Sequence, residues 1–227
     1  MLNAIPPTLN IQGKFGETPK TREEYFKFAN HNNLKLRLLT SKTGIFGSYG
    51  GIEVTCDDGV LYGHGDGYSF QLPHKQMDGE DNFEIEDGEI CYYRTFGDIK
   101  RQHTYKDLIP HDIYENLIHV CTYLSQAGSI TNIHYDPYPG VIYQSSGRKR
   151  VVLIAPEHHG LFDMYPIDHP LKRRSRHDGV VDFTQFGCEY HEVIVNEGEY
   201  VFVPSMWLHY VETLDNDCIS LIIRTKM

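Results

Sequence analysis

Short runs in which apolar and polar residues alternate dominate the second half of the chain. Side chains on a β-strand alternate between its two faces, so each run predicts a strand. Glycine, asparagine, aspartate and serine separate the runs, which is typical of turns. The turn at 145–148, Ser-Ser-Gly-Arg, predicts a hairpin between its two neighbouring strands. The predicted strands cover residues 120–124, 130–135, 141–144, 149–154, 190–195, 200–203, 209–214 and 218–224.

The first half of the chain has a weaker pattern. Residues 21–24, Thr-Arg-Glu-Glu, resemble a capping box and predict the start of a short helix. Residues 34–72 are rich in glycine and β-formers, whereas residues 77–90 are acidic and predict an exposed loop. Residues 112–118 carry an apolar stripe with helical spacing and predict a second helix.

The pattern as a whole predicts a mainly β protein, a sandwich or barrel with a few helices before it. The 227 residues fit a single domain over 1–227, and 40% hydrophobic content is enough for a packed core. Within that domain we expect residues 1–119 to elaborate a β core of residues 120–227. A doubly wound parallel sheet is disfavoured, because the sequence lacks the long helices that it needs.

Charge and cysteine content restrict partners and location. The net charge of −10 argues against DNA as a partner, because phosphate binding needs basic surface. The basic run 172–176 leaves RNA open, although a solvated loop is its simpler interpretation. Five cysteines without CxxC spacing predict reduced thiols in a cytoplasmic or nuclear protein. No segment predicts a signal peptide or a membrane span, so we expect no membrane partner.

The residues with the clearest chemical potential are His134 and Asp136. They lie two apart on a predicted strand and therefore share a face, and with His209 they form the two-histidine, one-carboxylate set that is typical of non-haem Fe(II) sites. His-x-Asp is common by chance, and His64 with Asp66 forms a second example. That pair lies between glycines and is better interpreted as an exposed turn. For His209 the alternative is a core histidine bonded to backbone groups.

A lysine on a predicted strand gives a second indication. Alternation places Lys149 on the same face as Val151 and Leu153, and Arg150 on the opposite face. An inward lysine requires an anion, because buried lysines are rare unless paired. The far carboxylate of a bound dicarboxylic acid would provide it. In the alternative orientation Arg150 points inward and Lys149 is solvated.

Through these residues the chain resembles the JmjC/cupin-like Fe(II)- and 2-oxoglutarate-dependent oxygenases. It is most similar to their small hydroxylase branch, which includes the asparaginyl hydroxylase of hypoxia-inducible factor and tRNA wybutosine hydroxylase. The branch has Thr-x-x-His-x-Asp, Gly-x-Lys-Arg, Tyr-Pro…His-Pro…Arg-x-Ser and Gly-(Asp/Glu)-x4-Pro-x-x-Trp-x-His. The matching residues are Thr131, His134 and Asp136; Gly147, Lys149 and Arg150; Tyr165, Pro166, His169, Pro170, Arg173 and Ser175; and Gly198, Glu199, Pro204, Trp207 and His209.

The resemblance implies a double-stranded β-helix of the jelly-roll or cupin type, with Fe(II) bound by the histidine and aspartate set above. It implies that Thr131 and Lys149 bind the distal carboxylate of 2-oxoglutarate. Tyr143 and Arg224 are further candidates for the co-substrate site, and Tyr135 and Tyr143 are both candidates for orienting the metal ligands. Two positions depart from the branch. Arg224 stands where asparagine is common near the co-substrate, and Gly140 replaces a polar or aromatic residue.

The implied activity is that of a dioxygenase, which converts 2-oxoglutarate to succinate and hydroxylates a substrate. A protein side chain is the favoured substrate and an RNA base the alternative. Three other functions remain open: a JmjC-type lysine demethylase, a metal-binding cupin that does not use 2-oxoglutarate, and a binding module without turnover. The sequence leaves the identity of the substrate and the oligomeric state open, because fold and metal site do not specify them.

Overall fold

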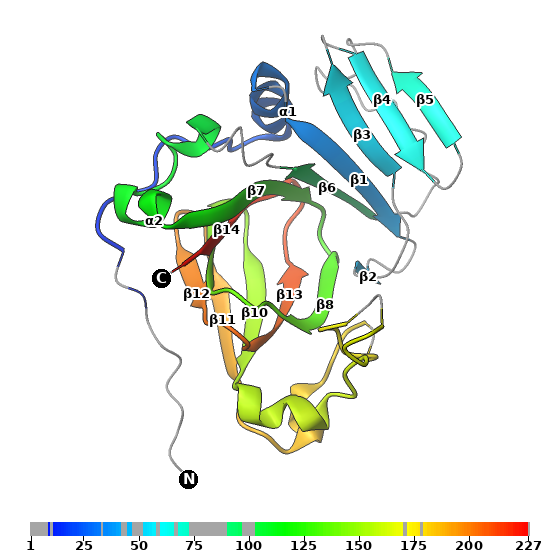
Figure 1. The fold of residues 1–227 in the computed structure, drawn as a ribbon, viewed down its shortest axis with the longest axis vertical. Coiled ribbons are helices and arrows are strands. Elements are labelled where there is room, and N and C mark those ends of the chain that lie inside the picture. The colour runs from blue at the N-terminus through cyan, green and yellow to red at the C-terminus, as the bar shows by residue number, and fades with distance from the viewer. Residues whose placement is uncertain are drawn as a thin grey trace.

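Two β-sheets face each other in the computed structural model of the protein (Figure 1). The structure describes residues 9, 11–32, 34–41, 45–46, 52–57, 60–65, 68–72, 90–96, 103–169, 172–177 and 179–226. The nine-stranded sheet contains, in spatial order, β12 (Tyr200–Val203), β9 (Gly140–Ser146), β14 (Cys218–Thr225), β7 (Leu117–Ser125), β6 (Ile90–Phe96), β1 (Lys35–Ser41), β3 (Ile52–Asp57), β4 (Val60–Gly65) and β5 (Tyr68–Leu72). The five-stranded sheet contains β11 (His191–Val195), β10 (Lys149–Ile154), β13 (Leu208–Thr213), β8 (Ile130–Tyr135) and β2 (Ile45–Phe46).

From β7 onward, the chain passes repeatedly from one sheet to the other. The larger sheet takes β7, β9, β12 and β14, and the smaller takes β8, β10, β11 and β13. This path winds the chain into a double-stranded β-helix, which confirms the predicted fold class. The predicted strands 130–135 and 200–203 agree with β8 and β12 to the residue.

The turn at 145–148 joins the two sheets and does not close a hairpin. β9 pairs with β12 and β14, whereas β10 pairs with β11 and β13. The predicted hairpin was therefore wrong, because a short turn between two apolar strands has the same sequence pattern whether the strands pair or diverge. Gly147 has a φ of 72°, and an added Cβ there would lie 3.3 Å from Cys218. Glycine thus allows this turn its left-handed conformation.

The N-terminal half supplies the helices and extends the larger sheet. The first predicted helix is α1 (Arg22–His31), and the Thr21 hydroxyl accepts a hydrogen bond from the Glu24 amide at 3.2 Å. The second is α2 (His111–Glu115), which is shorter than predicted because the chain enters β7 at Leu117. None of the helices in the described part of the chain is long and apolar enough to cross a membrane.

The β-rich stretch 34–72 forms β1 to β5, as predicted. Within it, His64 lies in strand β4 opposite Ser69 of β5, so its assignment to an exposed turn was wrong. Residue 66 and most of the predicted acidic loop, 77–89, lie outside the described residues. The described residues also include 3₁₀ helices at Pro156–Leu161 and Phe183–Phe186.

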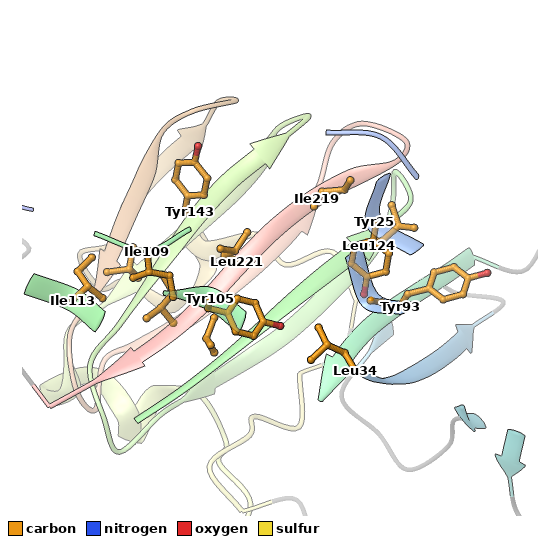
Figure 2. Close-up of a cluster of buried hydrophobic side chains, with 14 of the residues drawn as sticks. Tyr25, Leu34, Tyr93, Tyr105, Ile109, Ile113, Leu124, Tyr143, Ile219 and Leu221 are labelled. Carbon is orange, nitrogen blue, oxygen red and sulfur yellow. The ribbon is translucent and has the colours of Figure 1, made fainter. Parts of the chain in front are cut away.

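Alternation along the strands sorts the apolar side chains into three layers. The layer between the sheets contains Ile142, Val151, Leu153, Ala155, Val195, Val203, Trp207 and Val211. The layer outside the larger sheet packs under α1 and α2 (Figure 2) and includes Tyr25, Tyr105, Ile113, Tyr143, Leu221 and Ile223. The layer outside the smaller sheet includes Ile130, Ile133, Val152, Phe162, Val181, Phe183 and Tyr210.

The layer under the helices gives a test of the fold. Leu221 is fully buried there, so Leu221→Ala leaves a cavity and lowers the free energy of unfolding by about 2–5 kcal/mol. Ile167→Ala is the matched control, because Ile167 is 72% exposed. Urea unfolding measures both changes. Equal effects of the two substitutions would contradict the assigned layer.

Candidate metal centre

The pairing of β8 with β13 brings the two histidines of the predicted triad together. His134 stands directly opposite His209, and their ring centroids are 4.0 Å apart. Asp136 follows β8 and turns the same way. Its Oδ2 atom lies 4.0 Å from Nε2 of His134 and 3.6 Å from Nε2 of His209. One ligand atom from each residue therefore lies within 4.8 Å of the others, a spacing that one metal ion can bridge.

An irregularity in β8 decides which of its side chains face this site. Along β13 the step from His209 to Val211 is two residues, but the opposite step from His134 to Thr131 is three. The extra residue is a β-bulge, and it places Thr131 and His134 on the same face. Ile130 and Ile133, also three apart, share the outer apolar layer for the same reason.

Backbone carbonyls fix the tautomer of both histidines. Nδ1 of His134 lies 2.7 Å from the Asn132 carbonyl oxygen, and Nδ1 of His209 lies 3.1 Å from that of Trp207. A carbonyl can only accept, so both Nδ1 atoms carry the proton and both Nε2 atoms keep a lone pair. Burial lowers the pKa of His209 to about 4 and lowers that of His134 as well. Neutral imidazole is the form that binds a metal.

Two arginines flank the carboxylate. Arg224 donates from Nη2 to Oδ2 of Asp136, and Nη1 of Arg173 lies 3.9 Å from Oδ1. Burial alone raises the pKa of Asp136, but Arg224 and the other nearby cationic groups outweigh it and hold that pKa well below its usual range. The amide of Met206 donates to the backbone oxygen of Asp136 at 2.8 Å and ties the turn before β13 to the site.

Lys149 points into the space between the sheets. It is 3% exposed and stands opposite Thr213, in the same register in which Leu153 stands opposite His209. Burial lowers the pKa of Lys149. The centroid of the Tyr123 ring lies 5.9 Å from Nζ, and no described carboxylate pairs with the ammonium. A buried ammonium in this setting matches an anionic ligand.

Arg150 points the opposite way, as alternation predicts for an inward Lys149. Its guanidinium contacts Glu192 at 2.9 Å and Glu212 at 3.2 Å on the outside of the smaller sheet. The alternative orientation, with Arg150 inward, is therefore excluded.

The remaining predicted residues divide into two groups. Thr131 is half-buried on the inner face, and Arg224 contacts Asp136. Tyr143 lies in the layer outside the larger sheet (Figure 2). There it stacks on Phe15, with ring centroids 3.8 Å apart. That placement contradicts its assignment to the co-substrate site. Tyr135 stacks on His159 and packs against the outer layer of the smaller sheet.

Sequence reasoning missed two features of the site. Tyr123 faces inward from β7, and the position of Leu124 in the layer under the helices would have indicated this. The basic run 172–176 is also not a simple solvated loop. Arg174 pairs with His134 through an isolated antiparallel β-bridge of the backbone. Ser175 is 2% exposed, and its amide donates to the Ile133 carbonyl at 2.9 Å. The run thus forms one wall of the site.

The donor set fits a divalent first-row metal. Two imidazole nitrogens and one carboxylate oxygen occupy one side of the site, which is the arrangement that leaves positions for small ligands. Carbonyl bonds to both histidines preorganise the rings, as second-shell partners do in metal sites. Two imidazoles without a thiolate favour Fe(II) and its neighbours over purely oxygen-binding ions.

Comparison with known proteins agrees with this geometry. The family profile of the cupin-like domain matches residues 93–223. JmjC domain-containing protein D from Dictyostelium discoideum is 29% identical over 109 residues, which are 44% of this chain and 23% of that protein. Lysine-specific demethylase 8 from Xenopus tropicalis is 28% identical over 109 residues, with 44% and 24% covered. The similarity to these relatives thus spans about a quarter of their length.

A solved structure shows the same fold. The ribosomal oxygenase YcfD from Escherichia coli superposes with a TM-score of 0.51 and 12% sequence identity. The superposition covers 92% of this chain and 45% of YcfD. At this identity the likeness concerns the path of the backbone.

The depressed pKa of His209 predicts a pH dependence of stability. The unfolded chain takes up a proton at His209 near pH 6.5, but the folded protein does so only near 4. The free energy of unfolding therefore falls as pH falls between these values, on the order of 3 kcal/mol for this residue. The contribution of Asp136 is lost only below its unfolded pKa of 3.8. Unfolding with denaturant from pH 4 to 7, with chelator present, measures the slope.

Two variants separate His209 from the other histidines. His209→Gln makes the pH dependence shallower, and the part that remains comes from His134, whose pKa burial also lowers. His111→Gln, which changes a side chain that is 79% exposed, is the control. An unaltered slope in His209→Gln would contradict the assignment.

Proposed function

Because the chain belongs to the cupin-like domain family, we propose that it is an Fe(II)- and 2-oxoglutarate-dependent oxygenase that hydroxylates a protein side chain. His134, Asp136 and His209 hold the metal. Lys149, Thr131 and Tyr123 bind the distal carboxylate of 2-oxoglutarate. When bound, iron and 2-oxoglutarate together activate O2, and 2-oxoglutarate leaves as succinate and CO2.

The observation that supports this function best is the inward orientation of Lys149. A buried ammonium on the metal-facing side of the barrel suits a ligand that carries a carboxylate at a distance from the metal, as 2-oxoglutarate does. Lys149 and Leu153 are four residues apart on β10, about 13 Å along a strand, and Leu153 stands opposite His209. The lysine side chain covers part of that separation. A five-carbon diacid, chelated at the metal through one end, covers the rest.

The protein contributes geometry and a dry interior. Burial keeps both imidazoles neutral, and the two carbonyl bonds fix the proton on Nδ1 and hold the rings in place, so the ligands need little reorganisation when a metal binds. The apolar layer between the sheets, which includes Val151 and Val211, excludes water from the space between Lys149 and the triad. Low dielectric there strengthens the attraction between the ammonium and a carboxylate.

The preference for a protein substrate rests on charge and on relatives. The net charge of −10 disfavours a nucleic-acid backbone, which leaves RNA as the second candidate. Demethylation of lysine, which the name of one relative describes, would proceed from the same centre through hydroxylation of an N-methyl group. We favour hydroxylation, because nothing in the described site distinguishes a methylated ammonium from other groups.

We further propose a cytoplasmic or nuclear location. Cys121, Cys188 and Cys218 are free thiols, and two of them are buried within the β core. Free thiols are typical of reducing compartments.

Anaerobic titration with Fe(II) and 2-oxoglutarate tests the proposal through the visible charge-transfer band of the chelate. Lys149→Met removes a charge-assisted hydrogen bond to the distal carboxylate and raises the Kd for 2-oxoglutarate by about 10- to 100-fold. Arg150→Met is the matched control, because Arg150 is the next residue and faces outward. It changes this Kd by less than about twofold.

His134→Ala abolishes the band by removing a metal ligand. A wild-type protein that binds iron tightly and gives no band with 2-oxoglutarate would overturn the proposed co-substrate. Equal affinities of the Lys149→Met and Arg150→Met variants would overturn the assigned role of Lys149.

A further inference from the structure

Gly140 and Arg224 form a single structural feature. They stand opposite each other where β9 pairs with β14. A Cβ added at Gly140 would lie 2.2 Å from Nη1 of Arg224 and 2.6 Å from the Ile223 carbonyl oxygen. Neither distance is compatible with a side chain at position 140. The glycine therefore provides the space in which the arginine side chain lies.

From that space, Arg224 reaches the oxygen of Asp136 that faces both histidines. Its Nη2 donates to Oδ2, the same atom that lies 3.6 Å from Nε2 of His209 and 4.0 Å from Nε2 of His134. A metal ion bound by the three ligands would thus use the same carboxylate oxygen that the guanidinium of Arg224 contacts.

The other terminal nitrogen of Arg224, Nη1, makes no comparable contact with the described residues. Nη1 is buried and has no hydrogen-bond partner among the described residues, and the Arg224 side chain as a whole is 16% exposed. A buried donor of a charged group that stays unsatisfied is costly. An anion beside the metal would satisfy it, because a guanidinium presents two adjacent donors in a plane that matches a carboxylate.

We propose that Arg224, seated against Gly140, is exchanged between two partners: it competes with the metal for Oδ2 of Asp136, and it binds a carboxylate of the co-substrate next to the metal. The second part of this proposal, the binding of a co-substrate carboxylate, rests on the proposed function. The first part, the competition for Oδ2, concerns the metal alone. The guanidinium thereby lowers the affinity for free metal and raises the affinity for 2-oxoglutarate in the loaded protein.

The two effects have opposite signs, which separates them from structural damage. Arg224→Met removes the competing cation and tightens Co(II) binding about tenfold. The same change removes a charge-assisted bond and weakens 2-oxoglutarate binding to the Co(II)-loaded protein about tenfold. Equilibrium dialysis gives the first Kd, and calorimetry of the loaded protein gives the second. Arg224→Lys keeps the positive charge but loses the two adjacent donors of the guanidinium. Both Kd values therefore lie between those of the wild type and those of Arg224→Met.

Arg173→Met is the electrostatic control. Arg173 also lies near Asp136, but at 3.9 Å from Oδ1, and its side chain is 40% exposed. Its loss removes the same charge from the same neighbourhood without freeing Oδ2. Co(II) binding therefore tightens less than in Arg224→Met, and 2-oxoglutarate binding does not weaken.

Gly140→Ala tests the glycine directly. The added methyl group displaces the guanidinium and reproduces the opposite-sign pattern of Arg224→Met. Gly160→Ala is the control, because nothing lies within 4 Å of a Cβ at Gly160. Contact with the Ile223 carbonyl also strains the β9–β14 pairing, so Arg224→Met and Arg224→Lys decide the question if Gly140→Ala does not fold.

A parallel fall of both affinities in Arg224→Met would overturn the proposal, as would unchanged binding of 2-oxoglutarate. If the wild-type Co(II) protein binds no 2-oxoglutarate, the proposed function fails. The change in Co(II) affinity then still decides whether Arg224 competes for Oδ2.

Discussion

The candidate site depends on the pairing of β8 with β13 and on one extra residue in β8. On a regular strand, residues three apart point to opposite faces. Without the bulge, an inward His134 would therefore leave Thr131 facing the outer layer. With it, one strand presents Thr131, His134 and then Asp136 to the interior. β13 adds His209 directly across the ladder. A slip of this register by one residue would turn the histidines outward and dismantle the site.

The electrostatics of the interior follow from this arrangement. The neutral imidazoles and the carboxylate gather at one end, where Arg224 and Arg173 hold Asp136 ionised. Lys149 also carries a buried charge; its ammonium lies over the ring of Tyr123, and no described carboxylate pairs with it. Burying an ammonium without a carboxylate partner opposes folding, which is the physical reason for proposing an anionic ligand at this position. The same reasoning applies to the buried Nη1 of Arg224.

Local pattern predicted much of the fold, because period-two alternation marks strands well. It could not show which sheet each strand joins, so the turn at 145–148 was assigned to a hairpin although it links the sheets. The histidine and aspartate set was readable from spacing together with family resemblance. Tyr143 was misplaced because alternation in β9 fixes its face only once the neighbouring Ile142 is known to lie between the sheets. The link between Gly140 and Arg224 needs the β9–β14 register, which no local pattern contains.

A crystal structure of the protein prepared anaerobically with Fe(II) and 2-oxoglutarate would show directly how the site binds its metal and co-substrate. We expect one iron bound by His134, Asp136 and His209, with 2-oxoglutarate chelated to it and the distal carboxylate within hydrogen-bond distance of Nζ of Lys149. Iron bound by other residues, or 2-oxoglutarate bound away from Lys149, would contradict this expectation.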